Sequence, residues 1–424
     1  MRPASVAQPI AAGIVAGVTG FASSFTLLIA GLHRAGATDD QAASGLLVLC
    51  VVPGLLTVVL SLWSRMPIML VWSTPAAALL LASDPGLDYR SVVGAFIVCG
   101  LLIVATGLWP WLARLVTRIP KPIASAMLAG ILFPICLAPV QASIEEPLLA
   151  LPIVLTWLVL ARLAPRWAVP AAVVVAVVVV AVSSSGVDLS QARLLPVLAP
   201  VLPGLDPAVL LGLGIPLYLV TMAGQNVPGV AVLRTFGYER PPVRAVFTAS
   251  GAGNILAAPF GGIALNLAAM TAAMAAGPDA HPDPQRRWIA SASGGATLAT
   301  LGLLSGVATT LVAVSPPLLI TAVAGLALLS ALVTALTTAL EEPAHRIVAL
   351  VTFLVAVSGV SIAGIGSAFW ALLVGGIVML WMGRWPRRRR RAPVTPDPDA
   401  TGPATGGATD PEATPGPDGA AAGR

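Results

Sequence analysis

The sequence predicts an all-α polytopic membrane protein, and three observations lead to that fold class. Hydrophobic residues occupy 57% of the 424 positions, only 10% are charged, and the mean hydropathy is +0.92. Ordinary soluble domains contain about 25% charged residues. Long apolar runs also recur along the whole chain, separated by short turns. Such a chain needs lipid as its solvent, because helices pair their backbone groups internally while apolar side chains face acyl chains.

Charged residues and Pro/Gly turns divide the apolar runs into segments. The turn at 33–40 ends the first run, Arg65 ends the second, and the acidic loop at 278–287 precedes a long run in the last third. A transmembrane helix needs about 20 apolar residues. Fourteen spans are therefore expected, at residues 8-32, 41-64, 67-82, 91-113, 122-142, 147-163, 168-187, 207-233, 243-257, 258-276, 288-313, 316-340, 344-359 and 361-383.

The basic residues orient these spans. With both termini in the cytoplasm, 20 of the 23 Lys and Arg residues fall in inner loops or tails, and the outer loops contain Arg34, Arg90 and Arg193. This asymmetry follows the positive-inside rule. We therefore expect a multi-pass protein of the bacterial inner membrane with both termini cytoplasmic. The net charge of +5 has the same origin, so nucleic acid is not an expected partner.

The chain is expected to form two halves and a tail. Residues 1-190 would contain spans 1–7 and residues 205-384 spans 8–14, and an odd number of spans per half places the halves in opposite orientations. Faint similarity between LLIAGLHRAGATDDQAASG and VAVLRTFGYERPPVRAVFTASG supports this inverted repeat. Residues 385-424 are rich in Pro, Gly, Ala, Thr and Asp, which predicts a disordered cytoplasmic tail.

The third segment of each half is broken. In RMPIMLVWSTPAAALLLA, residues 68–72 favour an extended chain and Pro75 suits the first turn of a helix. In NILAAPFGGIALNLAAMTAA, residues 259–262 interrupt the run and a helix follows. Short interrupted segments at matching positions indicate a transporter site. The alternative is two merely kinked helices, since Pro and Gly are tolerated in membranes.

Two half-helices at these places would turn their N-termini toward a cavity near the membrane midplane. Each N-terminus carries about half a positive charge and free N–H groups. The predicted spans place no Lys, Arg, Asp or Glu at that depth, and the carboxylates at 39–40, 145–146 and 341–342 fall near span ends. A site with dipoles and no carboxylates favours an anionic substrate.

Polar and aromatic residues at similar depth complete the predicted site. Gln225 and Asn226 are adjacent amides in TMAGQNVPG, and they either bind substrate or pair neighbouring helices. Ser24 and Phe25 in FASSFTLL occupy the matching place in the first half. The expected substrate-binding residues are Ser24, Phe25, Ser73, Thr74, Gln225, Asn226, Phe260, Gly261, Gly262 and Asn266.

No catalytic, metal or cofactor site is expected. His33, His281 and His345 are unclustered in predicted loops, and the three cysteines lie in apolar runs without a CxxC pair. An intramembrane enzyme needs acidic metal-binding clusters or a His/Asp/Ser constellation. The chain is therefore expected not to be an enzyme.

The strings TMAGQNVPGVAVLRTFGY, APFGGIALNLAAMTAA and SGVSIAGIGSAFWALLVGG resemble the benzoate:proton symporter family (BenE). The resemblance covers nearly the whole chain except the tail. It implies the fourteen-span, seven-plus-seven inverted-repeat fold shared with nucleobase and sulfate transporters, with core and gate domains. It also implies benzoate as the substrate, and a homodimer, because relatives with this fold are often dimers. Nucleobase relatives use an acidic residue in the eighth span, where this chain has Gln225.

The expected function is therefore import of benzoate, or a closely related aromatic carboxylate, by proton symport. The open alternatives are a carrier for another organic anion or a nucleobase-like solute, and a passive anion channel. The proton travels either on the substrate or on a carboxylate at a span end such as Glu341 or Glu342. The expected partners are the aromatic carboxylate, the proton and the lipid bilayer, and no cofactor.

Overall fold

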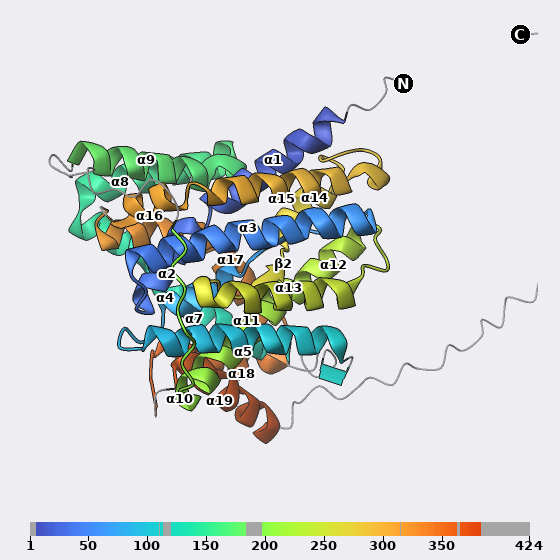
Figure 1. Ribbon diagram of the computed structural model, residues 1–424. Helices are drawn as coiled ribbons and strands as arrows, with labels where there is room; N and C mark the ends of the chain where they lie inside the picture. The colour runs from blue at the N-terminus through green and yellow to red at the C-terminus, as the bar shows by residue number, and fades with distance from the viewer. Residues whose placement is uncertain are drawn as a thin grey trace, which may run out of the picture. The chain divides into compact units, whose positions relative to one another are not determined.

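The computed structural model describes residues 6–109, 111–112, 120–183, 197–313, 315–362 and 365–382. The predicted tail at 385-424 lies outside the described residues. Most of the described chain is helical (Figure 1). In the first half the long helices are α1 Ala7–Ala22, α2 Phe25–Arg34, α3 Asp39–Ser64, α5 Tyr89–Leu108, α7 Lys121–Glu145, α8 Pro147–Leu163 and α9 Ala168–Ser183.

Local capping chemistry sets several of these boundaries. The Thr38 hydroxyl accepts a hydrogen bond from the Gln41 backbone, and the Gln41 side chain accepts one from the Thr38 backbone, so a capping box begins α3. The Asp88 carboxylate accepts backbone N–H groups at the start of α5. A hydrogen bond from the Ser91 hydroxyl, together with those from the backbone, lowers the pKa of Asp88.

The second half begins with a continuous but irregular helical segment. It runs through α10 Pro207–Val209, the π turn η3 Leu210–Gly214, α11 Ile215–Thr221, the π turn η4 Met222–Asn226 and α12 Val227–Thr235. Pro216 and Pro228 directly follow the starts of α11 and α12, and proline lacks the N–H that an α-helical ladder needs. The remaining long helices are α13 Val243–Ala257, α15 Trp288–Gly302, α16 Ser305–Ala313, α17 Pro317–Leu340, α18 Arg346–Val357 and α19 Ser367–Trp381.

Six helical segments within the described residues are long and apolar enough to cross a membrane. A seventh is the segment containing α15 and α16, which is bent by 57°. Shorter apolar helices include α8, α9 and α19. Large side chains such as Trp381 and Leu148 are almost fully exposed, as expected for surfaces that face lipid. The protein is thus a helical polytopic membrane protein, while the count of fourteen spans and the inverted repeat stay predictions.

Both broken segments contain a strand followed by a short helix. Strand β1 Leu70–Trp72 precedes α4 Thr74–Leu81, and strand β2 Leu265–Leu267 precedes α14 Met270–Ala276. The strands pair antiparallel, with Val71 opposite Asn266. Pro75 lies in the first turn of α4, which confirms that part of the prediction.

A helix does follow the interruption at 259–262, but it begins later along the chain. Gly261 ends the short turn η5 Ala258–Phe260 with φ +88°, in the left-handed region that favours glycine. The chain then runs through β2 before α14 begins at Met270. Pairing of β2 with β1 needs an extended backbone, so the helix starts nine residues after Gly261.

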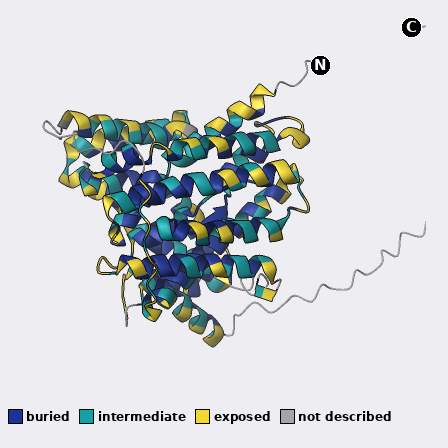
Figure 2. Ribbon diagram, viewed as in Figure 1, coloured by how far each residue is buried: buried dark blue, intermediate teal, exposed yellow. Residues whose placement is uncertain are grey.

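The strand pair lies among helices from distant parts of the sequence. Figure 1 shows α15, α3, α13 and α5 side by side, and the contacts between α3 and α15 and between α5 and α13 are extensive. A second group consists of α7 with α17 and α18, α18 with α19, and α8 with α9. Buried residues concentrate between these helices in Figure 2, and the strand residues Leu70, Leu265 and Leu267 are fully buried.

Candidate substrate cavity

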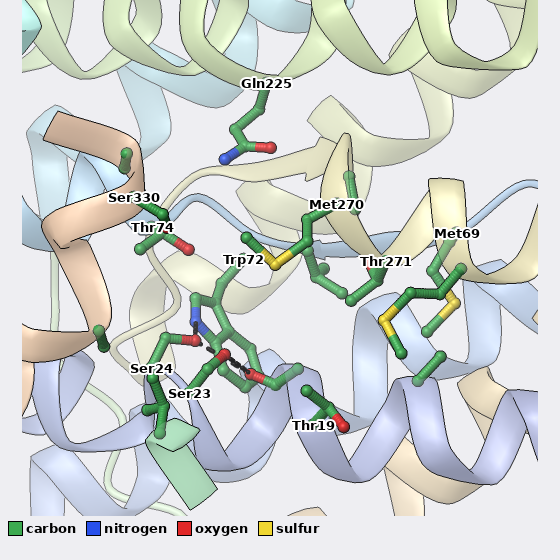
Figure 3. A pocket seen from close by; sticks show the side chains of 18 of the residues that line it. Thr19, Ser23, Ser24, Met69, Trp72, Thr74, Gln225, Met270, Thr271 and Ser330 are labelled. Atoms are coloured by element: carbon green, nitrogen blue, oxygen red, sulfur yellow. Dashed lines mark hydrogen bonds between the residues drawn. The ribbon is translucent and has the colours of Figure 1, made fainter. Parts of the chain in front are cut away.

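A cavity of about 430 Å³ lies where the two half-helices begin (Figure 3). Its volume is within the range of about 300–1,000 Å³ that is usual for small-molecule sites. We call it the half-helix cavity. Its lining includes Ser23, Ser24, Met69, Trp72, Thr74, Pro75, Gln225, Met270, Thr271, Met274, Leu328, Ser330 and Ala331.

Residues from the first turns of both half-helices face this cavity. Thr74 and Pro75 come from α4, and Met270 and Thr271 come from α14. Backbone N–H groups at a helix start lack intrahelical partners and give that end a positive potential. The Thr271 hydroxyl is buried and has no hydrogen-bond partner among the described residues. The cavity wall thus offers hydrogen-bonding groups to a solute.

Gln225 has a fixed orientation at the cavity. Its side-chain Oε1 accepts a hydrogen bond from the backbone N–H of Ala269, at 3.2 Å. Because a backbone N–H can only donate, the amide atom that faces Ala269 must be the oxygen. The other terminal atom of the Gln225 amide is therefore the nitrogen. Figure 3 shows the amide pointing toward the cavity. Gln225 therefore presents an N–H donor to a solute.

Ser24 supports an aromatic wall. The α1 and α2 helices are interrupted at Ser23 and Ser24, and both hydroxyls donate to the Gly20 carbonyl, at 3.0 and 3.1 Å. The Ser24 hydroxyl oxygen also accepts a hydrogen bond from Trp72 Nε1 at 3.1 Å. Phe21 meets the Trp72 ring edge-on, with 6.4 Å between centroids. The bond from Trp72 to Ser24 holds the indole in place beside the cavity.

Phe25 is close to this wall but does not line the half-helix cavity. Its ring stacks on Phe21, with 5.1 Å between centroids and 7° between planes. Ser73 also lies outside the lining: its hydroxyl oxygen caps α4 by accepting from Ala76 N–H, and it accepts from the Thr221 hydroxyl at 2.9 Å. Phe25 therefore packs against the aromatic wall, and Ser73 caps the half-helix, without either residue lining the cavity.

Asn226 and Asn266, which were predicted to bind substrate, do not line the cavity. Asn226 is fully buried, and its Oδ1 accepts a hydrogen bond from the Leu267 N–H at 2.8 Å. That bond ties the β2 strand to the irregular helix, so Asn226 pairs with a strand and not with a neighbouring helix. Asn266 is fully buried on β2 opposite Val71, without a side-chain partner among the described residues.

The residues from Phe260 to Gly262 lie elsewhere. The Phe260 carbonyl accepts a hydrogen bond from the Ser44 hydroxyl on α3 at 3.0 Å. A Cβ added to Gly261 would lie 3.0 Å from the Tyr89 hydroxyl on α5, and one added to Gly262 would clash with the Ala257 Cβ. None of the three lines the cavity, because β2 carries the chain onward before α14 begins.

Three of the ten predicted residues thus line the cavity, namely Ser24, Thr74 and Gln225. The prediction did not include Met270 and Thr271, although a Thr just after the interrupted run was the available signal. It also did not include Leu328 and Ser330 of α17. The run at 316–340 is apolar throughout, so its sequence does not show which helix face points to the cavity. No lining residue that the structure describes carries an ionisable side chain.

The chain matches one known protein family over most of its length. The family model described as benzoate membrane transport protein (BenE) matches residues 4–380. The chain belongs to the benzoate membrane transport protein family. This family consists of membrane transporters and not of enzymes. The resemblance drawn from the sequence strings is therefore confirmed.

Two relatives align with almost the whole of this family member. The inner membrane protein YdcO of Escherichia coli is 38% identical over 379 residues, which is 89% of this chain and 96% of the relative. The benzoate membrane transport protein of Acinetobacter baylyi is 30% identical over 368 residues, covering 86% of this chain and 92% of that protein.

Solved structures show the same fold at low sequence identity. The transmembrane domain of the cyanobacterial bicarbonate transporter BicA has a TM-score of 0.55 at 16% identity, covering 87% of this chain and 97% of that one. SLC26A9 has a TM-score of 0.57 at 15% identity, covering 88% of this chain and 65% of that one. The family member therefore shares the fold of these anion transporters.

Proposed function

We propose that this protein imports benzoate, or a closely related aromatic carboxylate, across the bacterial inner membrane by proton symport. The observation that carries the proposal is the half-helix cavity, which combines hydrogen-bond donors with aromatic and thioether walls and has no ionisable side chain among its described lining residues. The name of the Acinetobacter baylyi relative supports benzoate, and the name of the Escherichia coli relative supports the inner membrane.

The polar lining residues of the cavity suit a carboxyl group. Carboxylate oxygens only accept hydrogen bonds, and Gln225 presents its nitrogen as a donor while Ala269 occupies its oxygen. The Thr74 and Thr271 hydroxyls lie in the same lining and can rotate to donate or accept. Such a set can bind both the ionised and the protonated carboxyl group.

The aromatic and thioether lining residues suit an aromatic ring. Trp72 is held by Ser24, and Met69 and Met270 place flexible thioethers in the same lining. Thioether sulfur makes favourable contacts with aromatic rings, and aromatic pairs favour stacked or edge-on arrangements. A compact aromatic acid therefore satisfies both the polar and the apolar lining residues.

Proton coupling follows from the electrostatics of the cavity. Bringing an anion into a negative cell costs about 2.3 kcal/mol per 100 mV, so a uniporter of benzoate would leak substrate outward. A carboxylate buried without a cation has a raised pKa and takes up a proton. We therefore assign the transported proton to the substrate. Glu341 and Glu342, the alternative carriers, lie at the end of α17 and outside the cavity lining.

The proposed topology has fourteen spans in a seven-plus-seven inverted repeat, with residues 1-190 and 205-384 as the two halves and both termini cytoplasmic. It is supported by the arginine asymmetry and by the two paired strand–helix segments. A homodimer is the proposed assembly. A cysteine at exposed Asp88 should react with an impermeant reagent on intact cells, and one at exposed Arg240 should react only after lysis. Reaction at Arg240→Cys in intact cells would overturn this topology.

The transport proposal is tested with purified protein in proteoliposomes and labelled benzoate. Uptake against a benzoate gradient should require a lumen more alkaline than the bath, and an uncoupler should collapse it. Passive equilibration alone would indicate a channel, and competition by uracil but not by benzoate would indicate a nucleobase-like solute. Uptake that follows a sodium gradient and ignores the proton gradient would contradict symport with protons.

A further inference from the structure

A second cavity, of about 730 Å³, lies at the other end of α4. We call it the Arg34 cavity. The first turn of α4 faces the half-helix cavity, whereas Leu79, Leu81 and Ala82 at its end line this one. An eight-residue helix spans about 12 Å. The two cavities thus lie at opposite ends of one short helix, α4, which packs against α7.

Arg34 brings an unneutralised cation to this cavity. It is exposed at the end of α2, and its Nε donates to the Ser83 carbonyl at 3.1 Å, just beyond α4. Its two terminal nitrogens have no partner among the described residues. A guanidinium whose terminal nitrogens are available is the group that binds carboxylates by two parallel hydrogen bonds.

The remaining lining is mostly apolar. Ile131 and Ile135 of α7 and Val357 of α18 form one wall, and hydroxyl groups such as Ser361 contribute at the rim. Asp84 is the other charged lining residue that the structure describes, and its Oδ1 accepts a hydrogen bond from the Gly86 N–H at 3.2 Å. Asp84 makes no ion pair with Arg34 in the described chain.

We propose that the Arg34 cavity is a second binding site for an aromatic carboxylate, in which the Arg34 guanidinium holds the carboxylate and α7 and α18 contact the ring. The inference rests on the proposed function for the identity of the solute. The two cavities then differ in the group that meets the carboxylate: the Arg34 cavity binds the anion through a guanidinium, and the half-helix cavity, whose described lining residues include no cation, takes it with its proton. Asp84 opposes anion binding in the Arg34 cavity.

Charged thiol reagents test the site without any transported solute. Ala82→Cys places a thiol in the exposed lining, and the native cysteines are buried. Labelling by an anionic and by a cationic methanethiosulfonate gives a rate ratio that reports local charge. Arg34→Gln should lower the anionic-to-cationic ratio about tenfold, Arg34→Lys should retain most of it, and Asp84→Asn should raise it. An unchanged ratio in Arg34→Gln overturns the proposal.

Arg90→Gln is the matched control. Arg90 is also exposed and also donates its Nε to a backbone carbonyl, that of Leu202 at 3.4 Å, but it does not line the cavity. It should leave the ratio unchanged. A shift equal to that of Arg34→Gln would mean that reagents sense overall surface charge, and the proposal would fail. Elution as a single species with wild-type melting temperature establishes that each variant is folded.

Protection from labelling tests the occupant. Benzoate should slow reaction of Ala82→Cys with neutral N-ethylmaleimide, benzamide should not, and Arg34→Gln should abolish the protection. Equal protection by benzamide, or undiminished protection in Arg34→Gln, overturns the site. Absence of benzoate uptake in proteoliposomes with the reagent ratio intact would instead count against the proposed function and leave an anion site at Arg34.

Discussion

Gln225 Oε1 accepts a hydrogen bond from the Ala269 backbone N–H, and this bond turns the Gln225 amide nitrogen toward the half-helix cavity (Figure 3). The relationship joins the irregular helix at 207–235 to the residue that precedes α14. One side chain therefore supports a half-helix with its oxygen and presents a donor to the solute with its nitrogen.

Gln225→Glu should separate these two roles. Glutamate retains an oxygen for Ala269 but replaces the donor nitrogen with an oxygen that, when ionised, can only accept, so the carboxyl group of the substrate loses a hydrogen bond. Leaving that group unpaired costs about 1–3 kcal/mol, so the Kd for benzoate should rise roughly fivefold or more, with little change in melting temperature. Calorimetric titration of the detergent-solubilised protein measures this. Wild-type affinity in a folded Gln225→Glu protein would refute the assigned orientation.

Asn226→Leu should act on stability instead. The Leu267 N–H would lose its acceptor inside the protein, which costs about 1–3 kcal/mol. We expect a lower melting temperature and a near-normal KM for the protein that remains folded. Thermal unfolding and uptake assays should separate the two adjacent residues. Asn226→Leu should lower the melting temperature and leave KM near normal, whereas Gln225→Glu should weaken binding and leave the melting temperature near normal. A raised KM at unchanged stability would mean that Asn226 contacts the solute.

Ser24→Ala and Ser23→Ala form a matched pair for the aromatic wall. Both hydroxyls line the cavity and donate to the Gly20 carbonyl, but Ser24 alone of the two is bonded to Trp72. Loss of that bond, worth about 1 kcal/mol, should weaken benzoate binding roughly fivefold and alter tryptophan fluorescence. Ser23→Ala should change both much less, and equal effects in the two variants would argue against an orienting role for Ser24.

Arg287→Met should destabilise α14. Arg287 is only 6% exposed and donates to the carbonyls of Ala276, His281 and Pro282, at 2.9, 2.7 and 3.3 Å. Its charge also complements the negative end of the helix dipole. Each buried carbonyl left unpaired costs about 1–3 kcal/mol, so the melting temperature should fall by many degrees. Arg286→Met, at a neighbouring half-exposed side chain, is the control and should change it little.

Replacing Glu341 and Glu342 together by Gln should leave proton coupling intact. Both are exposed at the end of α17, and neither lines the half-helix cavity. Uptake should rise as external pH falls in the double variant as in the wild type, because the fraction of protonated substrate rises. The measurement is the pH dependence of the initial uptake rate in proteoliposomes. Loss of the pH dependence would place the proton on these glutamates.

The membrane class and the first half-helix were predictable from the sequence because their signals are local. Apolar composition makes lipid the solvent whatever the tertiary arrangement. Pro75 sets the first turn of α4 through its own ring, and the residues just before it favour an extended chain. The resemblance to the family was likewise carried by short strings, and residues 4–380 match the family model.

The site depended on contacts between distant residues. The break at Gly261 was visible, but the start of α14 at Met270 was decided by pairing of β2 with β1, about 195 residues away along the chain. The sequence alone does not distinguish the roles of the adjacent amides Gln225 and Asn226. Successive residues of the π turn η4 point in different directions, so Gln225 reaches the cavity and Asn226 reaches β2. Composition and local backbone chemistry thus determined the solvent, the class and one half-helix, whereas long-range strand pairing decided which side chains a solute would meet.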